Sequence, residues 1–313
     1  MTPINQKEIY LLELFISPAY LAELRDTWGD MIKHIERCLG DYMTKLPPDY
    51  RRKPLPEQPD AVWEGRILPN FRESYQALCS GVIALTHGDL KSLRSANGPL
   101  NDYKGQREYS SEWMAESDSA VYFELLNRSH TIALNICATE EPYWKPGELL
   151  EHPAARGNIE IPAVLPEYRL NTKIRTPTGG SVQQAGVYLP DLENGCPQYL
   201  NCYKKAPSAN VIQGVEDLLH PTTGEKYAEE PIFEKKDCLW TLVERCVTNK
   251  ITINAPALDE VQHRIMGGDT CPQSGYYFTP SRPDSLNFFE QGVVMPTYDT
   301  TYGATIWQWA AQQ

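Results

Sequence analysis

The chain has 313 residues, with 29 Lys and Arg against 41 Asp and Glu, which gives a formal net charge of −12 and a pI near 5.0. This acidic balance argues against general nucleic-acid binding, which needs excess Lys and Arg to neutralise phosphates, and favours a basic partner. The sequence lacks the run of about 20 apolar residues that a membrane-spanning helix needs, and its start lacks a signal-peptide pattern, so we expect neither a membrane span nor a secretory signal.

Apolar residues recur at spacings of three and four in the first part of the chain, which is typical of helices. They predict helices over about 18–46, 60–87 and 111–139. Ser17 and Pro18 mark the start of the first helix, because a hydroxyl side chain caps a helix N-terminus and proline suits the first helical position. The proline pair that follows Leu46 ends it.

The second predicted helix contains Pro69, which should kink or divide it, and Gly88 suits the position just past its end. Residues 92–98 and 101–109 are expected to be loops. Helices joined by short connections predict an antiparallel bundle over residues 1–140.

His34, His87 and His130 lie on separate helical stretches and could meet at a metal, but no Glu-x-x-His pattern accompanies them. The eight cysteines include no Cys-x-x-Cys pair, so we expect no metal and no cofactor. They are expected to be reduced thiols in a cytoplasmic protein. Three acidic residues lie near the start of the third helix, namely Glu112, Glu116 and Asp118. They suit the helix dipole there, and an acidic contact patch is the alternative.

The composition changes after residue 140. Residues 141–166 hold five prolines and two glycines, which predicts a linker or an irregular wrap. Short β-type runs bounded by Gly, Pro and Asn follow, so we expect two small β-modules, 167–249 and 250–313. The predicted fold class is therefore α+β, with an N-terminal antiparallel helical bundle and a β-rich C-terminal part.

An internal repeat supports the two β-modules. Residues 184–188 (QAGVY) match residues 273–277 (QSGYY), an offset of 89 from 184 to 273. The same offset pairs Ala206-Pro207 with Met295-Pro296 without a gap. We therefore expect the second module to be a duplicate of the first.

A tryptophan strand ends each copy of the repeat. Trp240 lies 33 residues past the proline of the first copy, whereas Trp307 lies 11 past that of the second, so the first copy carries an insertion at roughly 208–229. Alternate residues of a strand share one face, and both tryptophans are expected in the core. Trp309, near the chain end, is expected to be exposed and available for binding.

No catalytic signature stands out, and we expect no enzyme. Cys271 with His263 is the best nucleophile pair, but no third orienting residue is visible. The glycine pairs 179–180 and 267–268 do not fit a phosphate-binding loop.

Three segments near the C-terminus carry a resemblance, namely Cys271–Tyr277 (CPQSGYY), Phe289–Pro296 (FEQGVVMP) and Tyr302–Trp309 (YGATIWQW). Together they resemble bacterial polymorphic-toxin immunity proteins that are encoded beside type VI secretion effectors, many of them nucleases. In that family a Cys-Pro-x-(Ser/Thr)-Gly-(Tyr/Trp) turn precedes a Gly-x-x-Met-Pro segment and a Gly-x-Thr-x-Trp strand. The resemblance implies a cytoplasmic inhibitor that binds and neutralises one cognate toxin. It covers about 45 positions, and the helical part carries no such motif.

An acidic inhibitor would associate fast with the basic cleft of a nuclease through electrostatic steering, without contacting nucleic acid or a membrane itself. Acidic residues beside turn signals are therefore the predicted interface, together with Trp309: Asp191, Glu193, Glu229, Glu230, Asp284 and Asp299. Ordinary solubilising charge is the alternative for each. Two other functions stay open, an adaptor or chaperone that binds an effector for secretion and a hydrolase that uses Cys271.

Overall fold

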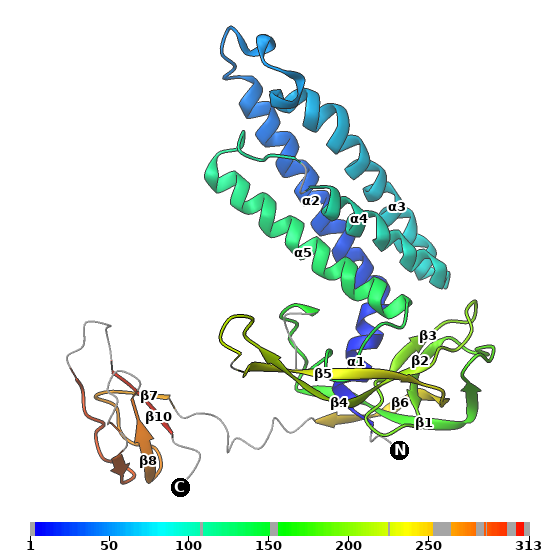
Figure 1. Ribbon diagram of the computed structural model, residues 1–313, viewed down its shortest axis with the longest axis vertical. Coiled ribbons are helices and arrows are strands. Elements are labelled where there is room, and N and C mark those ends of the chain that lie inside the picture. Colours follow the sequence, from blue (N-terminus) through cyan, green and yellow to red (C-terminus); the bar gives the residue numbers. More distant parts are fainter. Residues whose placement is uncertain are drawn as a thin grey trace. The chain divides into compact units, whose positions relative to one another are not determined.

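The computed structural model describes residues 4–106, 109–150, 156–224, 226–252, 264–279, 285, 287–298 and 305–309. The chain divides into two compact units, Met1–Ile251 and Thr252–Gln313. Helices fill the first part of the chain and small antiparallel sheets the rest (Figure 1), so the predicted α+β class is confirmed. The segments expected as a helical domain (1–140) and a first β-module (167–249) lie in the same unit.

Five α-helices form in the described residues, α1 (Gln6–Phe15), α2 (Pro18–Met43), α3 (Leu68–Thr86), α4 (Asn97–Gly105) and α5 (Glu116–Glu140). Shorter helical segments connect them, namely η1 (Tyr50–Arg52), η2 (Leu55–Glu57), the π-helical η3 (Asp60–Ile67) and η4 (Leu90–Ala96). From α2 to α5, consecutive helices run in opposite directions (Figure 1). Helix α2 packs against both α3 and α5.

The local signals of the first two predicted helices are found in the structure. The Ser17 hydroxyl accepts a hydrogen bond from the backbone N–H of Tyr20 and so caps α2. Pro69 lies in the first turn of α3, where the π-helical segment gives way to a regular α-helix. Gly88 has a φ of 89°, a left-handed conformation that glycine adopts without steric cost.

The prediction of loops at 92–98 and 101–109 was wrong, because η4 and α4 occupy much of this stretch. Pro99 lies in the first turn of α4, where its missing N–H costs no hydrogen bond. Gly98 lies against α3, and a Cβ at this position would come within 2.7 Å of the Ser74 hydroxyl oxygen. This Gly-Pro pair therefore marks a tightly packed helix start.

The helices and one side of the first sheet share a large core, and a second, smaller core forms around Trp240. The Trp28 indole of α2 donates a hydrogen bond of 3.0 Å to the Phe71 carbonyl of α3. Between α5 and the first sheet, Trp144 and Leu149 are buried, and the Trp144 ring stacks on Phe15 with 5.8 Å between centroids. The described parts of this segment, residues 141–150 and 156–166, thus pack onto the core.

The first sheet has the strand order β1-β6-β2-β3, with β1 at Val164–Pro177, β2 at Gly186–Pro190, β3 at Gln198–Leu200 and β6 at Leu239–Thr252. Helix α1 packs on β1 and β2, and α5 contacts β3. Strands β4 (Ala209–Leu219) and β5 (Lys226–Lys236) form a separate two-stranded sheet. This hairpin begins where the insertion 208–229 is expected and continues beyond it.

The second sheet has the order β7-β10-β8-β9, with β7 at Arg264–Met266, β8 at Gly275–Phe278, β9 at Asn287–Phe289 and β10 at Ile306–Trp309. This order corresponds strand for strand to that of the first sheet. Gly186 pairs with Leu200 in the first sheet, and Gly275 pairs with Phe289 in the second, both at the offset of 89 residues.

Side-chain hydrogen bonds recur at the same offset. The Tyr188 hydroxyl donates to the Gln184 carbonyl at 2.7 Å, and the Tyr277 hydroxyl donates to the Gln273 carbonyl at 2.8 Å. One isolated β-bridge recurs as well. Ser181 bridges to Lys205 in the first module, and Thr270 bridges to Val294 at the corresponding positions of the second. The two sheets therefore share their strand order, register and local hydrogen bonds.

Candidate partner-binding site

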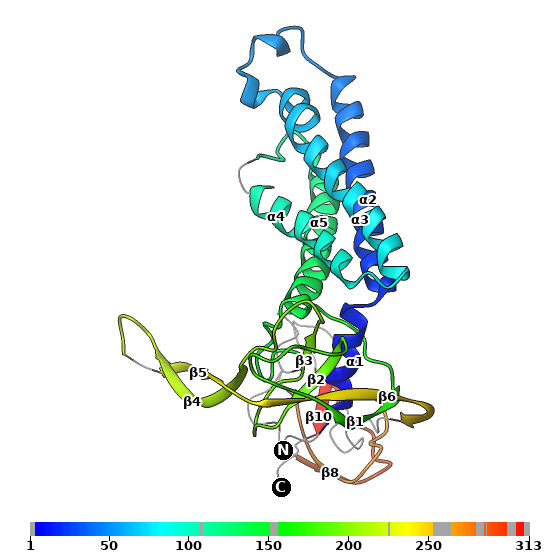
Figure 2. The ribbon, with the colours of Figure 1, turned by 90° about the vertical axis from the view of Figure 1, so that its right-hand side faces the viewer.

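The two-stranded sheet Ala209–Lys236, which we call the acidic hairpin, extends away from the first sheet (Figure 2). Its base is held by a bridge between Gly195 and Val211 and by the Lys145 ammonium, which lies 4.8 Å from the Phe233 ring centroid. Farther out, Val215 and Leu219 are each 56% exposed. A two-stranded ribbon without a packing layer is only marginally stable in water.

Four carboxylates lie on two neighbouring rungs of the acidic hairpin. Glu216 pairs with Glu230 across the strands, and Asp217 pairs with Glu229. Lys226 forms ion pairs with Asp217 at 2.7 Å and with Glu229 at 2.5 Å. Hydrogen bonds to Asp217 and then Glu229 raise the pKa of Lys226. This rung is therefore partly neutralised within the hairpin, by one cation shared between two carboxylates.

The other rung has no such compensation. Adjacent residues of a strand point to opposite faces, so Glu216 and Glu230 lie on the face away from Asp217 and Glu229. Both are exposed, and within the described residues neither forms an ion pair. Like charges directly opposite each other destabilise a sheet. Two carboxylates in this arrangement suit a guanidinium or ammonium group of a partner.

The interface residues predicted from the sequence lie in different surroundings in the structure. Glu229 and Glu230 are neighbours on β5, and their side chains lie on opposite faces of the hairpin. Asp191 accepts a hydrogen bond from the Leu239 backbone N–H at 2.8 Å, which is a structural contact, and Glu193 is exposed in the neighbouring turn. Three predicted residues remain. Asp284 and Asp299 lie outside the described residues, and of Trp309 only the backbone is described, paired with Tyr277.

Glu216 and Asp217 were missed by the sequence analysis. Their pairing with residues 229–230 follows from a hairpin centred on Thr223, beside Gly224 with its φ of 71°. The Thr-Thr-Gly turn was the available signal, because reflecting the sequence about it brings the two acidic pairs face to face.

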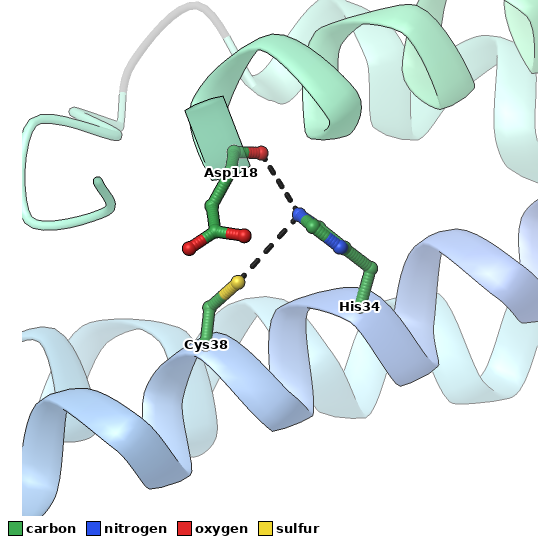
Figure 3. A group of neighbouring side chains, drawn as sticks. All are labelled: His34, Cys38 and Asp118. Carbon is green, nitrogen blue, oxygen red and sulfur yellow. Dashed lines mark hydrogen bonds between the residues drawn. The ribbon is translucent and has the colours of Figure 1, made fainter. Parts of the chain in front are cut away.

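His34, Cys38 and Asp118 form a second polar cluster (Figure 3), and their candidate ligand atoms lie within 4.8 Å of one another. Among the described residues this is the group that could hold a metal ion. However, a guanidinium nitrogen of Arg37 lies 2.6 Å from an Asp118 carboxylate oxygen, where a cation would bind. The hydrogen bond from Arg37 lowers the pKa of Asp118, and burial raises the pKa of the Cys38 thiol.

The His34 side chain links two helices through a hydrogen bond. Its Nε2 donates to the Asp118 backbone carbonyl at 2.8 Å, which joins α2 to the start of α5. The other two histidines lie elsewhere, since the ring of His87, just past the end of α3, bonds to the Ile83 carbonyl of that helix, and His130 stacks on Tyr103. The three histidines do not meet at one site.

Cys271, the alternative nucleophile, is 1% exposed and packs around Trp307 in the core of the second sheet. Its thiol donates to the Gln273 carbonyl at 3.1 Å. At the repeat offset, the first sheet places Val182 at this core position. His263 lies outside the described residues. The surroundings of the Cys271 thiol are those of a small core side chain.

A cavity of about 940 Å³ lies beside the π-helical segment. Trp63 and Trp113, whose ring centroids are 5.3 Å apart, contribute to its wall. Its charged groups balance, with two cations and two carboxylates: Lys53, Arg66, Glu57 and Glu112. The lining therefore indicates no preference for ligand charge.

No protein-family model, curated protein or solved structure matches the chain. Within the described residues, none of the helices has the length and apolar character needed to cross a bilayer.

Proposed function

We propose that this protein is an immunity protein that binds a secreted antibacterial toxin, a nuclease with a basic cleft, and blocks that cleft with the acidic hairpin. The observation that carries the proposal is the opposed pair Glu216 and Glu230, two exposed carboxylates without a counter-ion in the described structure. Arg and Lys side chains that hold phosphates in a nuclease can pair equally with carboxylates.

The energetics of the hairpin support this function. Opposed carboxylates repel each other in the free protein, and a cation of the toxin placed between them removes that repulsion on binding. The net charge of −12 also attracts a basic partner over a distance of about a Debye length, roughly 8–10 Å. The rung of Asp217 and Glu229 adds two further carboxylates on the opposite face.

We also infer that the helices form an antiparallel bundle and that the two sheets are related modules. Their common strand order and register support the relation between the sheets. The acidic hairpin is then an insertion into the first module that adds the binding surface. All eight cysteines are free, which suits the proposed cytoplasmic location.

Coexpression tests the proposal. The toxin encoded beside the gene should stop growth when it is expressed alone, and this protein should restore growth and copurify with the toxin. The double charge reversal Glu216→Lys with Glu230→Lys should abolish rescue. Glu124→Lys is the matched control, because Glu124 is an exposed residue of α5 away from the hairpin, and it should rescue as the wild type does. Absence of both rescue and complex would refute the assignment.

An adaptor that loads an effector for secretion would also bind the toxin, but it need not abolish activity. A nuclease assay on the purified complex separates the two functions. Inhibition by the wild-type protein supports immunity, whereas a fully active toxin in a stable complex would favour the adaptor.

A further inference from the structure

The two corresponding sheets differ in what covers one of their faces. In the first sheet, Val187 lies opposite Tyr199, and these side chains are only 4% and 1% exposed. At the same positions of the second sheet, Tyr276 lies opposite Phe288, and these are 41% and 53% exposed. The face that is buried in one sheet is therefore open in the other.

Helices of the chain itself cover this face in the first sheet. Val187 belongs to the same buried cluster as Leu12 and Phe15 of α1. Helix α1 is fixed there by Gln6, whose side-chain carbonyl accepts a hydrogen bond from the Tyr168 backbone N–H of β1 at 3.0 Å. The first sheet thus shows what this kind of face accepts, an amphipathic helix lying across the strands.

The exposed face of the second sheet has the features of a contact surface. Tyr276 and Phe288 meet edge to face, with 5.3 Å between ring centroids. Aromatic side chains of this kind supply much of the binding energy at protein interfaces. The described part of the second unit exposes further apolar side chains, including Met266 at 52% and Val294 at 59%.

We propose that the Tyr276–Phe288 face binds an amphipathic helix of a partner protein in the way that α1 covers the first sheet. Helix α1 of a second copy cannot bind this face, because its apolar side, including Leu12 and Phe15, is already buried in its own chain. Residues 252–313 carry six acidic and two basic side chains, so the bound helix has basic residues beside its apolar stripe. This surface shares no residue with the acidic hairpin, and the proposal does not depend on the toxin assignment.

Site-specific photocrosslinking identifies what occupies the face. The photoreactive residue p-benzoylphenylalanine replaces Phe288 in the full-length protein in its native cells, and mass spectrometry locates the crosslinked peptide. The same residue placed at Tyr143, which is 68% exposed, serves as control. We expect crosslinks from position 288 to a segment of another protein with apolar residues every three or four positions and basic flanks, and no such crosslink from position 143. Crosslinks only within the chain or to a second copy, or a yield no higher than at position 143, would overturn the proposal.

Affinity then tests the two aromatic residues. A synthetic peptide of the captured segment should bind the full-length wild type, and Tyr276→Ser and Phe288→Ser should each weaken binding by at least about 10-fold. Tyr143→Ser should bind normally, and circular dichroism should show that each variant retains its fold. Glu216→Lys with Glu230→Lys should leave peptide binding unchanged, so failure of this proposal is distinguishable from failure of the hairpin proposal. Equal peptide affinity of wild type and both folded serine variants would contradict it.

Discussion

Trp240 and Trp307 occupy the same place in two different sheets, and each donates its indole N–H to the carbonyl of a proline earlier in the chain. The acceptor is Pro207, 33 residues before Trp240, at 2.7 Å, and Pro296, 11 residues before Trp307, at 2.8 Å. Both indoles are fully buried. The acidic hairpin lies in the longer of the two intervals, so its presence leaves the tryptophan contact unchanged.

Removing this hydrogen bond should destabilise either sheet. Trp240→Phe and Trp307→Phe leave a proline carbonyl without its indole donor, and each should lower the free energy of unfolding by about 1–3 kcal/mol, with some added cost for the smaller ring. Urea unfolding followed by circular dichroism measures the loss. Tyr143→Phe, at an exposed position, is the control, and a tryptophan variant as stable as this control would contradict the shared role.

Glu140 should make stability depend on pH. It accepts a hydrogen bond from the Tyr203 hydroxyl at 2.6 Å and forms ion pairs with Lys204 and Arg94, both at 3.3 Å. Burial alone would raise the pKa of Glu140, but the Tyr203 hydrogen bond and the charges of Lys204 and Arg94 outweigh burial and hold this pKa below its ordinary value of 4.5. The carboxylate therefore stabilises the fold above about pH 4.5, and this contribution is lost as the pH falls through the lowered pKa.

Glu140→Gln should accordingly cost roughly 2 kcal/mol of unfolding free energy at pH 7, where the ion pairs are lost, and much less near pH 3, where the wild-type carboxyl is protonated as well. Denaturant unfolding at pH 7, 5 and 3 measures the difference. A destabilisation of the same size at all three pH values would show that the ionised carboxylate is not the source of the stabilisation.

Cys271 should tolerate replacement by valine. Its counterpart in the first sheet is the buried Val182, so Cys271→Val fills the same core position with a side chain of similar size, at a cost below about 1.5 kcal/mol. Full toxin neutralisation by this variant is the expected result. Loss of function in a folded Cys271→Val protein would revive the hypothesis that the thiol is a nucleophile.

The acidic hairpin should show a trade-off between stability and function. Glu216→Lys replaces a repulsive cross-strand pair with an attractive one, which should stabilise the hairpin by a few tenths of a kcal/mol to about 1 kcal/mol. The same change should weaken neutralisation, because the toxin would meet a lysine where it needs a carboxylate. Hydrogen exchange of the β4 and β5 amides reports the first effect and growth rescue reports the second. A variant with a less protected hairpin would indicate that the charges serve folding.

Local signals in the sequence predicted much of this fold. The start of α2 was predictable because the Ser17-Pro18 capping pattern acts through adjacent residues. Helix α4 was not, because Gly98 and Pro99 are common helix breakers and only the packing of Gly98 on Ser74 shows why a helix starts there. The repeat was visible because the core positions around the two tryptophans preserve their spacing.

The candidate sites depend on contacts between distant residues, and the sequence revealed them only in part. Glu229 and Glu230 were predicted from charge beside a turn, but their partner Glu216 belongs to another strand whose register is set by the whole hairpin. In the sequence, Tyr276 and Phe288 have the features of ordinary strand residues. Their exposure is a property of helix placement, since the same face of the first sheet is covered by α1.

Titration of purified toxin with the purified protein, with residual toxin activity as the readout, tests whether the acidic hairpin blocks the toxin. We expect complete inhibition at one equivalent of wild type. The folded variant Glu216→Lys with Glu230→Lys should require at least about 100-fold more protein, the loss expected when charge pairs that contribute some 3 kcal/mol are removed from an interface. Equal inhibition by the wild type and this variant would contradict an acidic hairpin that blocks a basic cleft.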